Sequence, residues 1–170
     1  MTTQHAFNSR TIPGPQDITR VELSNGVVVL ARANFSSPSV TIGGWLNVGS
    51  LLDSDKMLGL ANLTALALMR GSRNYDFLQI YNSLESVGAS LSFASGTHAT
   101  AFSGRALVED LDQLLLIMAD VLRQPTFPKK PVNKIRDQLL TGLALRAQST
   151  EDQAAMAFDA AVYSDHPYAR

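Results

Sequence analysis

The first part of the chain is dominated by β-branched residues and turn signals. Two runs rich in strand-forming residues, 19–23 and 27–31, flank Asn25 and Gly26, a pair that favours positive φ in a tight turn. This pattern predicts a β-hairpin. A second hairpin is predicted over residues 89–104, a stretch that is low in charge and rich in Ser, Ala and Thr.

A separate strand is predicted between these hairpins, over residues 39–48. It contains Gly43 and Gly44 followed by Trp45, and glycines inside a strand indicate a bend or a close approach of the backbone to a neighbour. Residues 49–58, which follow, are predicted to form a loop.

Helical patterns occupy most of the remaining chain, because apolar residues recur there at three- and four-residue steps. The first segment is apolar nearly all round, so it is predicted to be a buried helix that ends near Gly71. In the last segment, Thr150 and Gln153 are predicted to form a capping box at the N-terminus. The predicted helices cover residues 60–69, 75–87, 108–122, 131–146 and 151–163.

The order of these elements, β-β-β-α-α-β-β-α-α-α, predicts the fold class. Grouped antiparallel hairpins favour an α+β domain, with an antiparallel-rich, mixed sheet and helices packed on one side, over a doubly wound parallel sheet. Residues 1–16 are polar and include Pro13, Gly14 and Pro15, so they are predicted to be a flexible N-terminal arm. Residues 17–170 are expected to form a single α+β domain.

Composition supports one packed domain and removes several classes of function. The 170 residues are 45% hydrophobic and 17% charged, with a net charge of −1, so neither disorder nor binding to nucleic acid is expected. The longest apolar run, residues 114–119, is far shorter than the ~20 residues that cross a bilayer, so no membrane span is expected. The chain contains no Cys, which removes thiolate ligands and Cys nucleophiles.

The sequence offers few candidates for metal ligands, cofactor-binding motifs or catalytic residues. The three histidines, His5, His98 and His166, lie far apart in sequence, whereas zinc sites are built from closely spaced pairs, so ordinary histidines and no metal site are expected. The chain has no Gly-x-Ser-x-Gly, P-loop or Gly-x-Gly-x-x-Gly motif, and no cofactor is expected. Arg136 and Asp137 are interpreted as a helix-surface ion pair, and no residue is predicted to be catalytic.

A family resemblance covers nearly the whole chain. It is carried by RVELSNGVVVL (20–30), SP (37–38), GGWLNVGS (43–50), GLA (59–61), RGS (70–72), GA (88–89), PTFP (125–128) and HPY (166–168). In this order and spacing, these segments resemble the insulinase/pitrilysin (inverzincin) family of zinc peptidases, which includes the mitochondrial processing peptidase and the core subunits of the cytochrome bc complex. The resemblance implies the N-terminal domain of that family.

The sequence departs from the family at the motif that carries the chemistry. In active members an inverted His-x-x-Glu-His motif supplies two zinc ligands and a general base. The matching positions here are Asn62, Ala65 and Leu66, of which Asn is a poor zinc ligand and Ala and Leu can neither bind metal nor move a proton. The family's third ligand, a Glu, falls near Gly142 and Leu143, and there is no Glu from residue 110 to residue 150.

The resemblance therefore implies a non-catalytic member without zinc of its own. It implies a heterodimer with an active zinc peptidase subunit, in which this chain closes the chamber and assists binding of a peptide or unfolded protein. A structural scaffold subunit, as in the respiratory core proteins, is the alternative, and a peptidase with a rearranged site is a third hypothesis. The family also implies a second homologous domain and a first domain that extends beyond residue 170.

Two further expectations concern peptide contact and location. An edge strand over residues 40–48 is predicted to receive an extended peptide by strand addition, a mode that reads the backbone. A cytoplasmic location is expected, because the sequence shows neither an apolar secretion signal nor an Arg-rich presequence.

Overall fold

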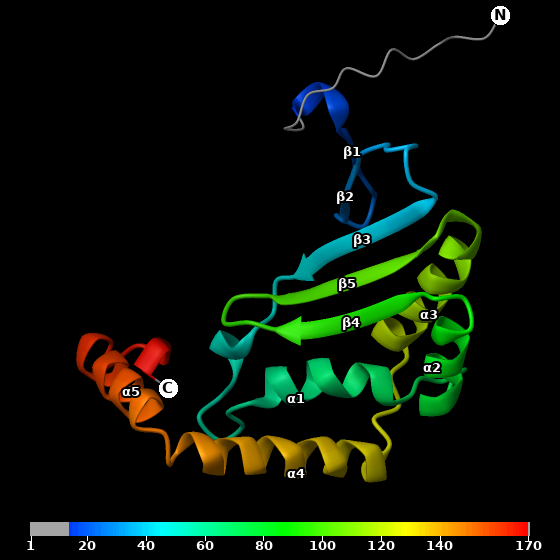
Figure 1. Cartoon of the computed structure of the whole chain (residues 1–170). Coiled ribbons are helices and arrows are strands. Elements are labelled where there is room, and N and C mark those ends of the chain that lie inside the picture. The colour runs from blue at the N-terminus through cyan, green and yellow to red at the C-terminus, as the bar shows by residue number, and fades with distance from the viewer. Residues whose placement is uncertain (1–13, 170) are drawn as a thin grey trace, which may run out of the picture. The chain divides into compact units, whose positions relative to one another are not determined.

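The computed structural model describes residues 14–169 (Figure 1). The chain divides into two compact units, with the division between Pro38 and Ser39. Residues 1–13 of the predicted arm, including His5, lie outside the described residues. The first described element is a 3-10 turn at Pro15–Asp17.

The first unit contains the predicted hairpin. Strands β1 (Thr19–Glu22) and β2 (Val28–Ala31) pair antiparallel. In the turn, Gly26 has a φ of 83°, a conformation that favours glycine, and Asn25 Oδ1 accepts a hydrogen bond from Val27 N at 3.2 Å. The hairpin prediction is confirmed, although of the two turn residues only Gly26 takes the positive φ.

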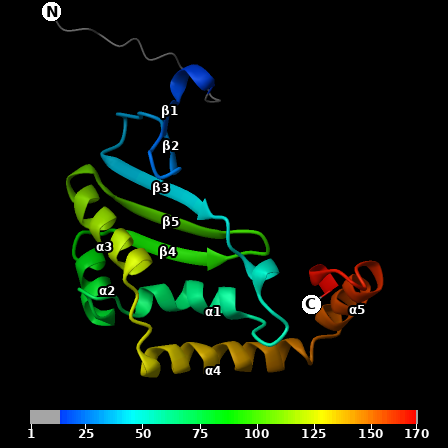
Figure 2. The same cartoon turned by 180° about the vertical axis from the view of Figure 1, so that it is seen from behind.

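The second unit is built on a three-stranded antiparallel sheet. Its strands are β3 (Ser39–Leu46), β4 (Ser90–Ser95) and β5 (Thr100–Leu107), in the order β3-β5-β4. Helices α1 (Leu60–Ala67), α2 (Phe77–Glu85) and α3 (Leu111–Arg123) cover one face of this sheet (Figures 1 and 2). The α+β class and the one-sided helical layer are therefore confirmed.

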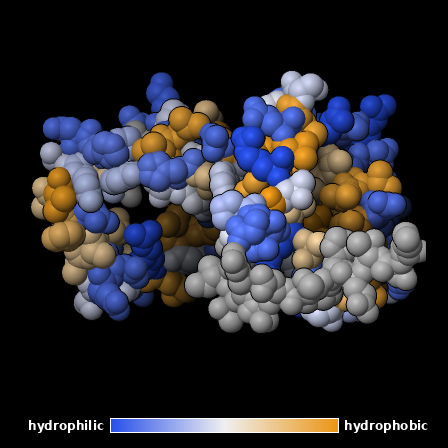
Figure 3. Space-filling view, turned by 90° about the horizontal axis from the view of Figure 1, so that it is seen from above, coloured by the Kyte–Doolittle hydropathy of each residue, from blue (hydrophilic) through white to orange (hydrophobic). Residues whose placement is uncertain are grey.

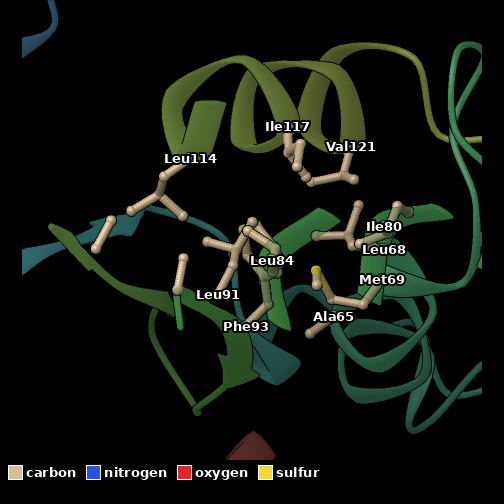
Figure 4. Packing of buried hydrophobic residues seen from close by; sticks show 12 residues of the cluster. Ala65, Leu68, Met69, Ile80, Leu84, Leu91, Phe93, Leu114, Ile117 and Val121 are labelled. Atoms are coloured by element: carbon tan, nitrogen blue, oxygen red, sulfur yellow. The ribbon is translucent and has the colours of Figure 1, made fainter. Parts of the chain in front are cut away.

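The core of this unit lies between the sheet and the helices (Figure 4). In β4, Leu91 and Phe93 point into it and alternate with exposed residues, as expected for a half-buried strand. Leu114, Ile117 and Val121 line the facing side of α3 and are almost completely buried. The buried cluster comprises Ala65, Leu68, Met69, Ile80, Leu84, Ala89, Leu91, Phe93, Ala106, Leu114, Ile117 and Val121.

The two glycines of β3 have different surroundings. Gly44 lies opposite Phe102 of β5, and a Cβ at Gly44 would stand 2.5 Å from the Phe102 ring. At Gly43 the nearest atom to an added Cβ is 3.9 Å away. The close approach predicted for this strand therefore occurs at Gly44, and a side chain rather than backbone makes it.

Two long helices complete the second unit. Helix α4 (Lys129–Arg146) lies beside α1, and α5 (Thr150–Val162) follows it (Figures 1 and 2). Both start earlier than predicted. Pro131 lies in the first turn of α4, where its missing N–H is not needed, so it does not mark the start. In α5 the N-cap is Ser149, whose Oγ accepts from Asp152 N at 3.2 Å, so the predicted capping role of Thr150 is wrong.

Helix α1 is buried on one side only, which corrects the prediction of a helix buried all round. Ala65 and Ala67 are 2% and 1% exposed, whereas Asn62 is exposed and Leu66 is 37% exposed. The reason is that the sheet and α4 cover part of the helix, while residues on its other side, such as Asn62 and Leu66, stay exposed. Figure 3 shows a different face of the molecule, the one seen from above Figure 1, on which polar and hydrophobic residues are interspersed.

Candidate functional site

A buried carboxylate positions the N-terminus of α1. Asp53 Oδ2 accepts a hydrogen bond from Gly59 N at 2.9 Å, and Oδ1 accepts one from Ala61 N at 3.1 Å. These bonds satisfy two backbone donors of the first turn, as a capping side chain does. Gly59 has a φ of 87°, which brings the chain from the loop into the helix and suits only glycine without strain. The direction of α1 is thus set by residues that precede it.

A groove runs between α1 and α4, two helices that lie side by side (Figures 1 and 2). Because the start of α1 lies against the end of α4, Asn62 shares the groove with Gly142 and Leu143. Its volume is about 530 Å³. We call it the α1–α4 groove; its lining residues are Met57, Leu58, Gly59, Leu60, Asn62, Leu63, Arg136, Gln138, Leu139, Leu140, Gly142, Leu143 and Arg146.

The groove is apolar with a positive edge. Seven of its lining side chains are Leu or Met, two are Arg, and none is acidic or His. Arg136 pairs with Asp137 at 3.3 Å on the surface of α4, as the sequence predicts, and Arg146 lies 3.7 Å from Asp152. Both pairs are exposed, so each contributes at most about 1 kcal/mol and leaves the arginines able to exchange partners.

A second cavity, of about 550 Å³, has His98, Tyr163 and Tyr168 among its lining residues. His98, in the turn between β4 and β5, shares a hydrogen bond with the hydroxyl of Tyr168, although 70 residues separate them. The Tyr168 ring also stands edge-on to His166 and Tyr163, at centroid distances of 4.4 and 5.3 Å. Sequence reasoning treated His98 and His166 separately, because no local spacing connects them.

Asp120 of α3 forms hydrogen bonds with the loop before α2. Its Oδ1 accepts from Asn74 Nδ2 at 2.7 Å and its Oδ2 from Asn74 N at 3.2 Å. A hydrogen bond with the Ser72 side chain is the largest cause that lowers the pKa of Asp120; burial acts in the opposite direction, and the Asn74 bonds and the charge of Arg73 lower it further. These contacts stay within the protein, so Asp120 has a structural role that sequence patterns did not reveal.

Comparison with known proteins identifies the family. The family model described as Insulinase (Peptidase family M16) matches residues 28–170. The chain belongs to the insulinase family. Within residues 14–169, none of the helices combines the length and the apolar character needed to cross a membrane.

Relatives of this insulinase-family chain include subunits of larger assemblies. It is 26% identical over 136 residues to the probable mitochondrial-processing peptidase subunit beta of Arabidopsis thaliana, covering 79% of this chain and 25% of that protein. It is 27% identical over 149 residues to cytochrome b-c1 complex subunit 1 of Bos taurus, covering 88% and 31%. An uncharacterized zinc protease of Mycobacterium leprae is 26% identical over 153 residues, covering 90% and 34%.

A solved structure agrees with this assignment. The peptidase M16 inactive domain from Pseudomonas fluorescens matches with a TM-score of 0.84 and 26% identity, over 91% of this chain and 38% of that chain. The insulinase-family chain thus spans between a quarter and two fifths of the length of the relatives it matches.

The positions that the family resemblance assigns to the zinc ligands and the general base are only partly brought together. Asn62 shares the α1–α4 groove with Gly142 and Leu143, the two positions nearest the expected third ligand. Ala65 is 2% exposed and belongs to the core cluster, while Leu66 is partly exposed outside the set of groove-lining residues. The spatial relation between α1 and α4 is therefore present without the side chains that the chemistry needs.

These side chains do not fit a zinc ion. Zinc sites in proteins use thiolate, imidazole or carboxylate groups, whereas the groove presents an amide, aliphatic chains and two guanidinium groups that would repel a cation. Among residues 14–169, no three His, Cys, Asp or Glu side chains are grouped so that they could hold a metal. What the groove can do chemically is to bury apolar groups and to attract anions.

Proposed function

We propose that this protein is a non-catalytic subunit of a zinc-peptidase assembly, in which it pairs with an active subunit, closes the chamber and helps to bind the peptide substrate. The observation that carries the proposal is the α1–α4 groove. There Asn62 occupies the position that the family resemblance assigns to the first metal ligand, and Gly142 and Leu143 lie near the position expected for the third, while the scaffold around them matches that of a peptidase M16 inactive domain.

Physical chemistry supports a binding role for this scaffold. Replacing charged and zinc-binding groups by Ala and Leu removes the cost of holding ionised groups in a partly enclosed site. The similarity to a processing-peptidase subunit beta, to a cytochrome b-c1 subunit and to an inactive peptidase domain is consistent with a chain that acts as part of an assembly. Recognition of peptide would then depend on surfaces such as the groove.

A structural scaffold subunit is the second candidate. The observation that favours it is the similarity to cytochrome b-c1 complex subunit 1, which extends over 88% of this chain. A scaffold needs the packed sheet and helices but no accessible binding groove. The two candidates therefore differ in whether peptide hydrolysis by an associated subunit depends on this protein.

The test is a titration of the full-length protein into an active subunit that contains His-x-x-Glu-His, with peptide hydrolysis and bound zinc measured on each component. A rate that rises and saturates at a one-to-one ratio, with zinc on the partner only, is the expected result. An unchanged rate would instead support the scaffold. Zinc bound to this protein alone, or hydrolysis by it alone, would contradict the assignment of Asn62, Ala65 and Leu66 as inactive positions.

A further inference from the structure

We propose that the α1–α4 groove binds an extended peptide segment in which apolar side chains lie between two acidic ones. This inference rests on the proposed function, since it names the class of peptide that such a subunit would bind. Three features of the groove favour such a peptide: the apolar lining, the placement of the two arginines and the polar groups within it.

The lining of the groove is apolar and open to solvent. Leu58 and Leu60, at the start of α1, are 57% and 44% exposed, and Leu140 and Leu143 of α4 are 56% and 57% exposed. Hydrophobic side chains gathered in one concave surface favour a ligand that removes them from water. At Gly142 the space that a Cβ would occupy is open, because no side chain and no other element of the chain comes within 4 Å of it.

The charged residues at the groove favour a negatively charged ligand. The chain as a whole has a net charge of −1, yet α4 contains five cationic residues and a single acidic one, Asp137. Arg136 and Arg146 line the groove itself, and their acidic partners, Asp137 and Asp152, are exposed and not among the lining residues. A basic peptide would be repelled at this surface, whereas carboxylates would pair with guanidinium groups. The cationic residues of α4 are Lys129, Lys130, Lys134, Arg136 and Arg146.

The spacing of the arginines sets the spacing of the acidic side chains. Arg136 and Arg146 are ten residues apart on α4, which corresponds to about 15 Å along a helix axis. An extended peptide advances about 3.3 Å per residue, so carboxylates that reach both arginines are about four to five residues apart. The apolar side chains between them would lie over Leu140, Gly142 and Leu143.

Polar groups inside the groove suit a peptide backbone. Asn62 and Gln138 line it from the two helices, and each amide side chain offers both donors and an acceptor. A peptide main chain needs both kinds of partner, because its N–H and C=O groups lose water on binding. A simple hydrocarbon ligand would leave these amides unpaired.

The experiment measures binding of a fluorescent, end-capped peptide Glu-Ser-Leu-Leu-Ser-Glu to the full-length protein by fluorescence anisotropy. Two matched peptides carry Lys in place of both Glu residues, or Ser in place of both Leu residues. We expect the acidic peptide to bind at least about tenfold more tightly than either one. Equal binding of the Lys peptide, or no binding of the acidic peptide, would overturn the inference.

Variants locate the binding on the protein. Gly142→Leu places a side chain into open space in the groove and also favours the helix, so it blocks the site without a packing clash. Gly142→Ala is its control. The double variant Arg136→Glu/Arg146→Glu reverses the charge of the groove, and Lys130→Glu/Lys134→Glu makes the same change on α4 outside the groove lining.

The two groove variants are expected to weaken binding of the acidic peptide by about tenfold or more, whereas their controls change it about twofold or less. The arginine reversal should also make the Lys peptide the better ligand, a gain that an unfolded protein would not show. Unchanged affinity in both groove variants would refute the site.

The hydrolysis titration of the proposed function distinguishes the two proposals. Stimulation of the partner that is insensitive to Gly142→Leu would refute the groove while the subunit role stands. Peptide binding without stimulation would refute the subunit role while the groove stands.

Discussion

Asp53 and Gly59 determine how α1 begins. The Asp53 carboxylate accepts the Gly59 N–H at 2.9 Å, and its other oxygen accepts the Ala61 N–H at 3.1 Å, while Gly59 adopts a φ of 87°. Asp53 is only 8% exposed, so water does not readily replace these bonds. The start of α1, and with it one wall of the α1–α4 groove, therefore depends on a residue outside the helix.

Removing this carboxylate is expected to destabilise the protein. Asp53→Ala leaves two backbone donors of α1 without their partner, which costs about 1–2 kcal/mol. Urea denaturation followed by circular dichroism measures the loss. The neighbouring exposed Ser54→Ala serves as the control and should change the free energy of unfolding by less than about 0.5 kcal/mol. Equal effects of the two substitutions would show that Asp53 does not hold the helix.

Asp120 should make stability depend on pH. Since the Ser72 and Asn74 hydrogen bonds lower its pKa in the folded state, the ionised carboxylate stabilises the fold above the unfolded-state pKa. That contribution is lost as the pH falls through the folded-state pKa. The Tm of Asp120→Asn should therefore lie below that of the wild type near neutral pH, and the difference should shrink below about pH 4.

Thermal melts from pH 3 to pH 8 follow this difference, with Asp112→Asn, an exposed position of the same helix, as the control. The part of the change with pH that exceeds the change seen with this control is the part specific to Asp120. A difference between wild type and Asp120→Asn that stays constant over this range would contradict the role of the ionised carboxylate.

Two leucines of α3 separate core packing from surface exposure. Leu114 is 0% exposed and Leu116 is 65% exposed. Leu114→Ala leaves a cavity between helix and sheet and should cost about 2–5 kcal/mol. Leu116→Ala, the same chemical change on the outer side, should cost no more than about 0.5 kcal/mol. The denaturant midpoints of the two variants, measured side by side, test this difference. Similar midpoints would mean that the core assignment of α3 is wrong.

Gly49 should not tolerate a side chain, whereas Gly43 should. A Cβ at Gly49 would lie 2.5 Å from Thr97 O and 2.6 Å from Gly96 O, both backbone atoms that cannot rotate away. Gly49→Ala should therefore cost about 2–3 kcal/mol or more. Gly43→Ala, where the nearest atom is 3.9 Å away, should shift the unfolding free energy by less than about 1 kcal/mol. A stable Gly49→Ala protein would contradict the contact between this loop and the turn of β4 and β5.

Several elements could be predicted from local sequence alone. Turn chemistry and hydrophobic period depend on neighbours in the chain, so both can be read from the sequence. They predict the hairpin at Asn25 and Gly26, the strand that contains Gly44, and the helices over residues 77–85 and 111–123. The starts of α4 and α5 were misplaced, because the first turn of a helix accepts Pro131 and because Ser149 competes with Thr150 as the cap.

The candidate site could be predicted only in part. A family resemblance indicated that Asn62, Gly142 and Leu143 belong together, and the structure places all three in one groove. The resemblance did not predict that Ala65 lies in the core or that Leu66 does not line the groove. The meeting of His98 with Tyr168 was likewise missed, because contacts between residues 70 positions apart leave no local pattern.

The sequence by itself determined the α+β class and the order of elements, because these depend on residue type and on short-range periodicity. Tertiary structure alone decided which face of α1 is covered, that α1 and α4 enclose an apolar groove, and that Arg136 and Arg146 lie at its edge. The physical reason is that burial and charge at a site arise from packing between segments about 80 residues apart, which local propensity does not specify.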